Sequence, residues 1–435
     1  MARIAVIGSG ISGLSAAWHL TRAQAGHHVT VYEAGAYFGG HANTVDVTLD
    51  GTTHGVDTGF LVYNERTYPG LISLFDELGV QRSPSEMSFS VQSPQTKGAA
   101  AVEWSGHSLN TVFAQRRNLI RPRFWSMLKD ILRFNQLSTQ LAQSGAEAAL
   151  AQPIGEFLDA HRFGKAFRED YFLPMVACIW SCPTKQMLRF PMATMIRFCH
   201  NHGLLQVTNR PQWYTVTGGS RQYVNKVLAH LHDVRLSTPV KAVTRQTNGV
   251  TVHTRHGHEA YDEVVMACHS DQALALLGQQ ASPAERVLLG AIRYQPNRAV
   301  LHTDVAMLPK RQSAWAAWNY ERAAADKTEQ SQVCLHYLLN HLQPLPWQQP
   351  VIVSLNPVRE PDAQKVIKEI EYAHPVFDQA AIDAQAALPS IQGLQHTWFA
   401  GAWCGYGFHE DGYQAGLRVA QHIQAEQTLS ARRAA

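Results

Sequence analysis

The sequence is poor in charged residues and cysteine, and it lacks long apolar runs. Only 16% of its 435 residues are Asp, Glu, Lys or Arg, and the formal net charge is +3. The basic residues are dispersed and no RNA- or DNA-binding motif accompanies them, so we expect no nucleic-acid partner. No apolar run approaches the ~20 residues that span a bilayer. A soluble or peripheral protein follows.

The six cysteines match no known framework of disulfides or zinc ligands, so we expect reduced thiols and no metal site. The apolar N-terminus lacks a cleavage-like site before its first glycines, which disfavours a signal peptide. The predicted location is cytoplasmic, either free or peripheral on the inner face of the cytoplasmic membrane. The length exceeds what one hydrophobic core usually supports, so two domains are expected.

The most informative pattern lies in residues 1–33. The apolar run Ile4–Ile7 precedes the glycine-rich turn Gly8–Gly13, which opens a helical pattern through Arg22. A second apolar run, Val29–Tyr32, ends in Glu33, twenty positions after Gly13. Strand, glycine turn, helix and strand followed by an acidic residue form the unit that binds the ADP half of a dinucleotide.

Each residue type in this unit has a physical role. Gly8 permits a tight turn, Gly10 lets the backbone approach a pyrophosphate, and Gly13 lets the helix pack close to the strand. The helix N-terminus, at Ile11 and Ser12, offers free N–H groups to the phosphates. Glu33 can accept hydrogen bonds from ribose hydroxyls and would repel a 2′-phosphate, which argues against NADP.

Four further segments resemble the flavin amine oxidase and phytoene desaturase superfamily. They are Glu33–His41, with its second glycine pair, Val56–Phe60, Trp398–Gly401, and Gly405–Gly412 ahead of a helix from about Tyr413 to Gln424. The resemblance implies FAD as the cofactor. It further implies contacts from these residues: Gly8, Gly10, Ile11, Ser12, Gly13, Glu33, Ala34, Gly39, Gly40, His41, Thr58, Gly59, Phe60, Val240, Gly401, Ala402, Gly407, Phe408 and His409.

Within that superfamily, the chain is similar to predicted oxidoreductases associated with cyclopropane fatty acid synthases. This likeness implies a lipid acyl substrate and a fatty acid methyltransferase as partner. Two positions depart from the wider pattern. His41 stands where an arginine usually follows the double glycine, so a permanent charge is replaced by one that titrates. Ala402 and Trp403 stand where an acidic residue often contacts the ribityl chain.

The resemblance implies an α/β fold in which a Rossmann-like FAD-binding domain with a parallel sheet is interleaved with an α+β substrate domain. The composition and pattern shifts predict these segments: FAD-binding 1–84, 209–287 and 389–428; substrate-binding 85–208 and 288–388; and a disordered tail 429–435. Within the second FAD-binding segment, Pro239–Val243 resembles the strand whose backbone meets the adenine.

The residues nearest the reacting atoms are expected in the C-terminal turn and in aromatic clusters. Tyr406 and His409 are the candidates in the turn; His409 would carry a proton or, alternatively, fix the turn by hydrogen bonding. Cys404 is either buried filler or a covalent flavin link. The candidates in aromatic clusters suit a hydrophobic pocket, although aromatic residues more often belong to the ordinary core; they are Trp180, His202, Trp213, Trp315, Trp318, Asn319 and Tyr320. Among them we single out Trp318 and Tyr320.

The stretch Phe113–Phe134 combines basic and apolar side chains and has two interpretations. It suits anionic headgroups and the acyl boundary of a membrane. It also suits a core-facing amphipathic helix with a solvated basic side. The residues concerned are Arg116, Arg117, Arg121, Arg123, Lys129 and Arg133, with Phe124, Trp125, Leu128, Ile131, Leu132 and Phe134.

Three functions remain open from the sequence. The flavin could oxidise or desaturate a hydrophobic acyl chain, or it could oxidise an amine at the carbon next to nitrogen. Amine oxidases of this superfamily commonly place a lysine near the flavin N5, and neither Lys310 nor Lys327 lies in a matching context. Third, the chain could hold lipid for a partner methyltransferase without turning it over.

Overall fold

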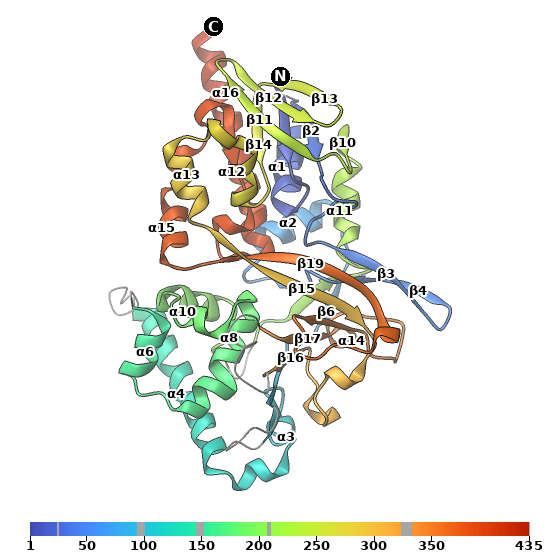
Figure 1. Ribbon diagram of the computed structural model, residues 1–435, viewed down its shortest axis with the longest axis vertical. Coiled ribbons are helices and arrows are strands. Elements are labelled where there is room, and N and C mark those ends of the chain that lie inside the picture. Colours follow the sequence, from blue (N-terminus) through green and yellow to red (C-terminus); the bar gives the residue numbers. More distant parts are fainter. Residues whose placement is uncertain (24–25, 94–100, 145–151, 207–209, 323–332, 435) are drawn as a thin grey trace.

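The computed structural model describes the chain except for residues 24–25, 94–100, 145–151, 207–209, 323–332 and 435. Its architecture is mixed α/β, as predicted. One end carries a parallel sheet with both chain termini, and the other carries a larger sheet and a layer of helices (Figure 1).

The parallel sheet has five strands in the order β10-β2-β1-β14-β20. Its central strand β1 is a short, almost wholly buried apolar run, Ile4–Ile7, as expected for a parallel sheet covered on both faces. Helix α1 (Ile11–Thr21) packs against the long C-terminal helix α16 (His409–Ala434). The strands are β1 (Arg3–Ile7), β2 (His28–Tyr32), β10 (Asp233–Arg235), β14 (Glu263–Met266) and β20 (Thr397–Phe399).

Several smaller elements lie outside the two large sheets and the helical layer. An antiparallel sheet of β11 (Val240–Gln246), β12 (Gly249–Thr254) and β13 (Gly257–Tyr261) contacts β1 and β14. The others are the hairpin β3 (Thr44–Leu49) and β4 (Thr52–Asp57), the sheet β5 (Tyr63–Asn64), β9 (Trp213–Val216) and β6 (Arg82–Ser85), and helices α2 (Pro69–Glu77), α11 (Arg221–Leu228), α12 (Ser270–Leu277), α13 (Pro283–Gly290) and α15 (Gln379–Ala387).

The larger sheet has seven strands in the order β19-β15-β18-β17-β16-β7-β8. Neighbours are antiparallel except for β7 and β16. Its strands come from residues 89–105 and 293–376, whereas those of the parallel sheet come from 3–32, 233–266 and 397–399. The strands are β7 (Phe89–Ser93), β8 (Val102–Ser105), β15 (Arg293–His302), β16 (Trp318–Glu321), β17 (Leu335–Leu338), β18 (Ile352–Leu355) and β19 (Val366–Val376).

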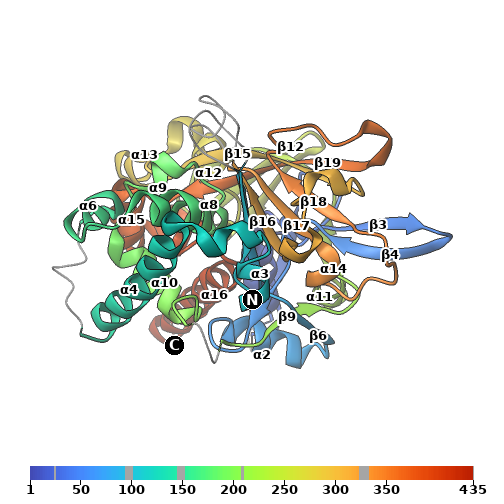
Figure 2. The same cartoon turned by 90° about the horizontal axis from the view of Figure 1, so that it is seen from below.

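A helical layer lies beside the seven-stranded sheet (Figure 2). It contains α3 (Leu109–Val112), a 3₁₀ turn Arg116–Ile120, α4 (Pro122–Ser144), α6 (Ile154–Ala160), α7 (Lys165–Phe167), a π-helical turn Arg168–Phe172, α8 (Leu173–Trp180), α9 (Thr184–Met187) and α10 (Met192–Asn201); α14 (Leu339–Leu342) follows β17. In the described part of the chain, every helix is too short or too polar to cross a bilayer.

Two local expectations about the C-terminus were wrong. The helix expected from Tyr413 begins at His409, because Asp411 accepts the backbone N–H of Phe408 at 2.9 Å and so stabilises an earlier helix start. The tail expected to be disordered from residue 429 is helical as far as Ala434, since it continues α16 without a glycine or proline to end it.

Candidate functional site

The glycine-rich turn has the backbone that the sequence predicts. Gly8 has φ +108°, and its N–H donates to Tyr32 O at 2.9 Å. A Cβ on Gly13 would lie 1.9 Å from Gly8 O, so any side chain there would push α1 off the strand. A Cβ on Gly10 would meet nothing within 4 Å. A side chain at Gly10 would therefore fit without a clash, but it would fill the open space in front of the turn.

The start of α1 faces the open space in front of Gly10. Its N-cap residue is Gly10, which has no side chain to accept the first helical N–H groups. Ile11, Ser12 and Gly13 occupy the first turn and are buried. Gly40 approaches from the second glycine pair, since a Cβ on it would lie 3.1 Å from Gly10 Cα. The arrangement fits a phosphate group close to backbone N–H donors.

Glu33 is held by backbone and by Ser9. Its carboxylate accepts hydrogen bonds from Ser9 N at 3.1 Å, from Ser9 Oγ, and from Gly35 N at 2.7 Å. A carboxylate has about four acceptor positions, so one remains for a ribose hydroxyl. Glu33 O accepts the N–H of Thr238 at 2.8 Å, which brings the strand that begins at Val240 beside Glu33. Ala34 is the next residue in the chain, and its side chain is exposed.

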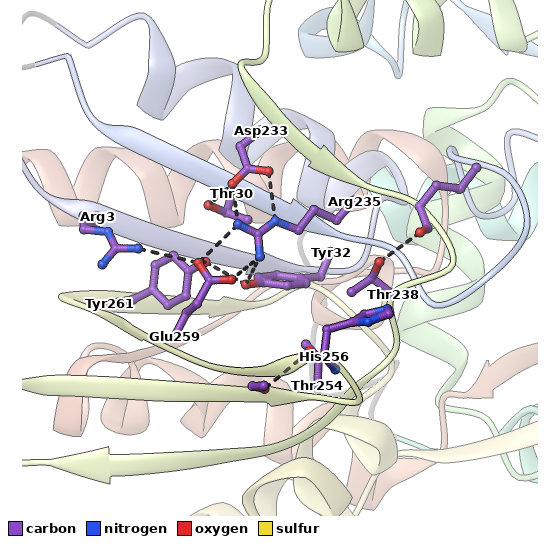
Figure 3. A network of polar contacts seen from close by, with 12 residues as sticks. Arg3, Thr30, Tyr32, Asp233, Arg235, Thr238, Thr254, His256, Glu259 and Tyr261 are labelled. Atoms are coloured by element: carbon purple, nitrogen blue, oxygen red, sulfur yellow. Dashed lines mark hydrogen bonds and ion pairs between the residues drawn. The ribbon is translucent and has the colours of Figure 1, made fainter.

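An ion-pair network holds this end of β2 in place (Figure 3). The Arg235 guanidinium bonds Asp233 at 2.8 and 2.9 Å, pairs with Glu259, and donates to Tyr32 Oη at 3.1 Å. Hydrogen bonds to the two carboxylates raise the pKa of Arg235, so its charge is permanent. Because Arg235 O also accepts the N–H of Glu33 at 2.9 Å, the network fixes where Glu33 begins.

The second glycine pair and the Thr58–Phe60 segment lie side by side. Gly39 N donates to Ser9 Oγ at 3.1 Å, and Phe60 N donates to His41 O at 2.7 Å. A Cβ on Gly59 would lie 2.3 Å from His41 O, so glycine is required for this approach. Thr58 donates to Asn43 O at 3.0 Å.

His41 is half-buried among other aromatic rings. Its ring stacks on Tyr372 at a centroid distance of 4.7 Å and lies 5.2 Å from His374. Burial, and then the neighbouring histidines His374, His269 and His409, lower the pKa of His41. Among the described residues, its Nε2 atom has no hydrogen-bond partner although it is buried. A buried ring nitrogen without a partner beside a glycine cradle fits a polar group of a bound cofactor.

Asp57 is a buried residue that joins several elements and that the sequence motifs do not identify as a contact residue. It accepts hydrogen bonds from Thr44 Oγ1 at 2.5 Å, Ser220 N at 2.9 Å, Ser220 Oγ at 2.8 Å and Gln343 Nε2 at 2.8 Å. Burial raises the pKa of Asp57 to about 6, against these hydrogen bonds. The carboxyl therefore joins β4, the start of α11 and the loop after α14 in one place.

The C-terminal turn is compact because of its glycines. Gly401 and Ala402 follow β20, and a Cβ on Gly401 would lie 2.1 Å from Trp403 Nε1, which donates to Cys268 O at 3.1 Å. Gly407 has φ +92°. Two further glycines let α16 approach α1: a Cβ on Gly412 would lie 2.7 Å from Ile11, and one on Gly416 would lie 2.2 Å from Ser12 O.

His409 is stacked and hydrogen-bonded. Its ring lies 3.8 Å from that of Phe60 at an angle of 9°, and its Nε2 atom lies 2.7 Å from Tyr223 Oη. Burial lowers the pKa of His409 to about 3. A neutral, fixed imidazole favours the positioning role over that of a proton carrier. Cys404 is similar, since burial raises the pKa of its thiol to about 12 and keeps it protonated.

An aromatic cluster lies against the same turn. Phe198 contacts Phe408 at 4.7 Å, His202 at 3.9 Å and Trp180 at 4.9 Å between ring centroids. The structure thus brings two predicted residues, Trp180 and His202, to the C-terminal turn by way of Phe198, which the sequence did not predict. Trp213 joins them by stacking on His202 at 6.2 Å. We call this set the aromatic cluster: Trp180, Phe198, His202, Trp213, Tyr406 and Phe408.

The other candidates of this group lie outside the aromatic cluster. Trp318 and Tyr320 project from one face of β16, which packs against α8; within the described residues, the buried Nε1 of Trp318 has no partner. Trp315 packs instead in a separate small group with Leu308, Leu338 and Ile352. Asn319 is a buried structural residue whose side chain bonds Ser90 Oγ and two backbone carbonyls.

The sequence matches the family model of flavin-containing amine oxidoreductases over residues 11–301. The chain belongs to this family, and it is therefore an FAD-dependent oxidoreductase. No curated protein shows significant similarity to it in sequence. The link to cyclopropane fatty acid synthases is a narrower prediction that this match does not reach.

Solved structures of similar fold cover almost the whole chain. A putative protoporphyrinogen oxidase from Exiguobacterium sp. 255-15 is 18% identical, with 98% of this chain and 99% of that chain covered and a TM-score of 0.66. A CLA-producing fatty acid isomerase from P. acnes is 16% identical, covers 97% and 98%, and has a TM-score of 0.66. A putrescine oxidase variant is 17% identical, covers 98% and 99%, and has a TM-score of 0.69. At these identities the likeness concerns the fold alone.

Proposed function

We propose that this FAD-dependent oxidoreductase oxidises or desaturates a hydrophobic acyl chain, such as an unsaturated, cyclopropane or methyl-branched fatty acyl group of a membrane lipid. The observation that carries the proposal is the aromatic wall along the C-terminal turn, whose own side chains carry no charge. For hydride transfer, the reacting carbon must lie against the flavin. The family resemblance puts the C-terminal turn beside the flavin, and the aromatic cluster lines that turn.

The polar groups within the aromatic cluster are neutral or already bonded. His202 bonds Phe198 O at 2.9 Å, and burial lowers the pKa of His202 to about 4. The indole N–H of Trp180 donates to Tyr406 O at 3.3 Å. Such a wall binds a hydrocarbon chain without leaving a buried charge unpaired.

The nearest carboxylates are engaged by backbone. Glu410 accepts the N–H groups of Gly70 and Leu71, both at 2.9 Å, at the start of α2. Asp411 accepts Phe408 N at 2.9 Å, and burial raises the pKa of Asp411 to about 6. An ammonium substrate would have to compete with these donors, whereas an acyl chain would not. The fatty acid isomerase of similar fold is consistent with an acyl substrate.

The bound flavin would supply the hydride acceptor. This chain's residues would hold it at the glycine turns and Glu33, orient the substrate with aromatic rings, and exclude water from the reacting carbon. Tyr406 and Phe408 from the turn, with Trp318 and Tyr320 on β16, are our candidates for substrate contact. His409 would position Phe60 by stacking on it.

Amine oxidation is the second candidate, because the matching family model is named for it and a putrescine oxidase shares the fold. Lys310 lies at the surface, where its backbone N–H bonds Glu103 at 3.1 Å, and Lys327 lies outside the described residues. A flavoprotein that presents lipid to a fatty acid methyltransferase without reacting is the third candidate.

The test is anaerobic reduction of the flavin in purified holoprotein. Dispersed phospholipids with unsaturated, cyclopropane or methyl-branched chains are compared with saturated lipid, putrescine and an aromatic amine. We expect one of the first three lipids to bleach the visible flavin band. Bleaching by an amine alone would establish the second candidate, and bleaching by none, with tight lipid binding, would favour the third.

A variant pair locates the substrate. Phe198→Leu should slow lipid-driven bleaching about tenfold while leaving the FAD content unchanged, since it removes a ring from the aromatic cluster. Phe157→Leu is the matched control, because Phe157 is equally buried but packs with His161 and Phe163 in the helical layer. Equal slowing in both variants would contradict this placement.

A further inference from the structure

The region between α3 and α4 exposes large apolar side chains beside arginines. Leu109 is 80% exposed, Ile120 85%, Trp125 50% and Leu119 48%. Figure 1 places α3 and the beginning of α4 at the end of the molecule opposite both termini. We call this surface the basic-apolar tip and define it by Leu109, Arg116, Arg117, Leu119, Ile120, Arg121 and Trp125.

The two interpretations of Phe113–Phe134 each apply to part of it. Phe124 and Phe134 are buried, so α4 does pack one face on the core, as the core-facing interpretation requires. Trp125 and Leu132 point outward instead, and the 3₁₀ turn before α4 exposes two consecutive apolar residues, Leu119 and Ile120. A core helix accounts for the first set and not for the second.

The exposed apolar groups are held rigidly. The indole N–H of Trp125 donates to Leu119 O at 2.9 Å, so the exposed part of that side chain is hydrocarbon. Its ring stands 5.4 Å from the buried Phe113. Backbone bonds from Asn118 N to Gln115 O and from Arg121 N to Asn118 O hold the turn itself. Little conformational entropy would be lost when such a surface docks.

The charge of the tip is of one sign. Residues 104–129 contain five basic residues, Arg116, Arg117, Arg121, Arg123 and Lys129, and no Asp or Glu. Arg123 pairs with Asp170 at 2.9 Å. The guanidinium groups of Arg116, Arg117 and Arg121 bond neutral acceptors: Asn110 Oδ1, Ala101 O and Asn118 Oδ1. Within the described part of the chain, these three arginines therefore form no ion pair, and their positive charges can attract an anionic surface.

We propose that the basic-apolar tip docks the protein on an anionic phospholipid surface, with Leu119, Ile120 and Trp125 entering the interface and Arg116, Arg117 and Arg121 meeting phosphate headgroups. Exposed apolar residues beside basic ones are the pattern of interfacial binding. The proposal is independent of the substrate class, since vesicle binding and flavin reduction are separate measurements.

The test is co-sedimentation of the holoprotein with vesicles. We expect binding to vesicles that contain phosphatidylglycerol, weaker binding to pure phosphatidylcholine, and loss of binding at 1 M salt, where the Debye length falls from about 10 Å to about 3 Å. The double variant Arg116→Gln/Arg117→Gln should bind about twenty-fivefold more weakly, at about fivefold for each charge. Ile120→Ser should bind about tenfold more weakly.

Matched controls lie at the other end of the molecule. Val287→Ser, at a residue that is 69% exposed on α13, and Arg255→Gln, in the turn after β12, should bind vesicles like the unaltered protein. FAD content and melting temperature should be unchanged in all these variants. No vesicle binding, equal losses in tip and control variants, or a dimer in solution that only tip variants dissociate would overturn the proposal.

Discussion

Glu33 and His409 are both held in place by specific partners, yet the partners differ in kind and in distance along the chain. Glu33 bonds Ser9, twenty-four residues away, and its neighbours are backbone amides and the charged Arg235 network. His409 stacks on Phe60 and bonds Tyr223, which is 186 residues away. The side chain of Glu33 is bonded by polar groups of its own βαβ unit, although the Arg235 network beside it comes from a distant segment. The surroundings of His409 are aromatic and neutral, and distant elements assemble them.

The difference follows from what each end must do. A pyrophosphate and a ribose need N–H donors and a carboxylate, which one βαβ unit can present on its own. A reacting carbon beside the flavin needs exclusion of water, which several layers must provide together. Contact residues within one βαβ unit can be recognised in the sequence by their spacing. Contact residues that come together from distant segments cannot. The predictions below test this contrast.

The largest effect is expected at Gly10. Gly10→Val should fold normally, because a Cβ there meets no atom within 4 Å, and should yield colourless protein, because the side chain fills the space of the pyrophosphate. The flavin absorbance of the purified protein and its circular dichroism check this. Gly106→Val, at an exposed turn with a similarly free Cβ position, is the control and should stay yellow. A yellow Gly10→Val protein would disprove our cofactor placement.

The next effect is a pH dependence at the aromatic end. Burial lowers the pKa of His374 to about 4 and that of His409 to about 3. Both are depressed below the unfolded value near 6.5, so their stabilising contribution is complete above that pH and is lost as pH falls towards 4. For His409 the loss should be about 3 kcal/mol at pH 4.5, at about 1.4 kcal/mol per pKa unit.

His409→Asn should remove that part of the acid sensitivity. We expect its melting temperature to fall less than that of the unaltered protein between pH 7.5 and pH 4.5.

Asp57 has the opposite pH dependence. Its pKa is raised to about 6, so its contribution to stability is complete below about pH 4 and is lost as pH rises through 6. Asp57→Asn should therefore gain relative stability on the neutral side. Parallel melting curves for all three proteins would contradict both assignments.

A smaller effect is expected at the nucleotide end. Glu33→Ala should weaken FAD binding by about 1.5–3 kcal/mol, because it removes a charged hydrogen bond to the ribose. This range corresponds to the one ribose hydrogen bond that Glu33 has left to accept. Fluorescence titration of the apoprotein with FAD measures it. Asp76→Ala, at an exposed position on α2, should leave the affinity unchanged. Equal affinity in both variants would show that the carboxylate bonds only Ser9 and Gly35.

The smallest effect is expected at Arg235. Arg235→Gln should lower the free energy of unfolding by about 1 kcal/mol, since the side chain is partly exposed and solvent screens its ion pairs. The affinity for FAD should fall only a few-fold, because Glu33 loses its support and not its contacts. Chemical denaturation and the same fluorescence titration check the two values. A loss of affinity larger than that of Glu33→Ala would give the network a direct role.

The parts of the site that follow from short spacing could be predicted. The turn Gly8–Gly13, the carboxylate of Glu33 and the strand–helix order around them depend on neighbours within one βαβ unit. Phe198, Tyr372 and His374 could not be predicted, because a lone aromatic or histidine in a helix or strand has the same local pattern whether it faces a site or the core. Trp315 illustrates this. Its sequence context resembles that of Trp318, but in the structure it packs with Leu308, Leu338 and Ile352.

The sequence by itself determined the mixed α/β fold, the family and the flavin. The glycines of the turn Gly8–Gly13 stand at a fixed spacing, and that spacing is typical of a tight turn whose backbone approaches a nucleotide. Tertiary structure alone decided that His409 is neutral and stacked on Phe60, that Asp57 joins three elements, and that Leu119 and Ile120 face outward. Burial and charge environment depend on which distant segments pack together, and these in turn set a pKa or expose a side chain.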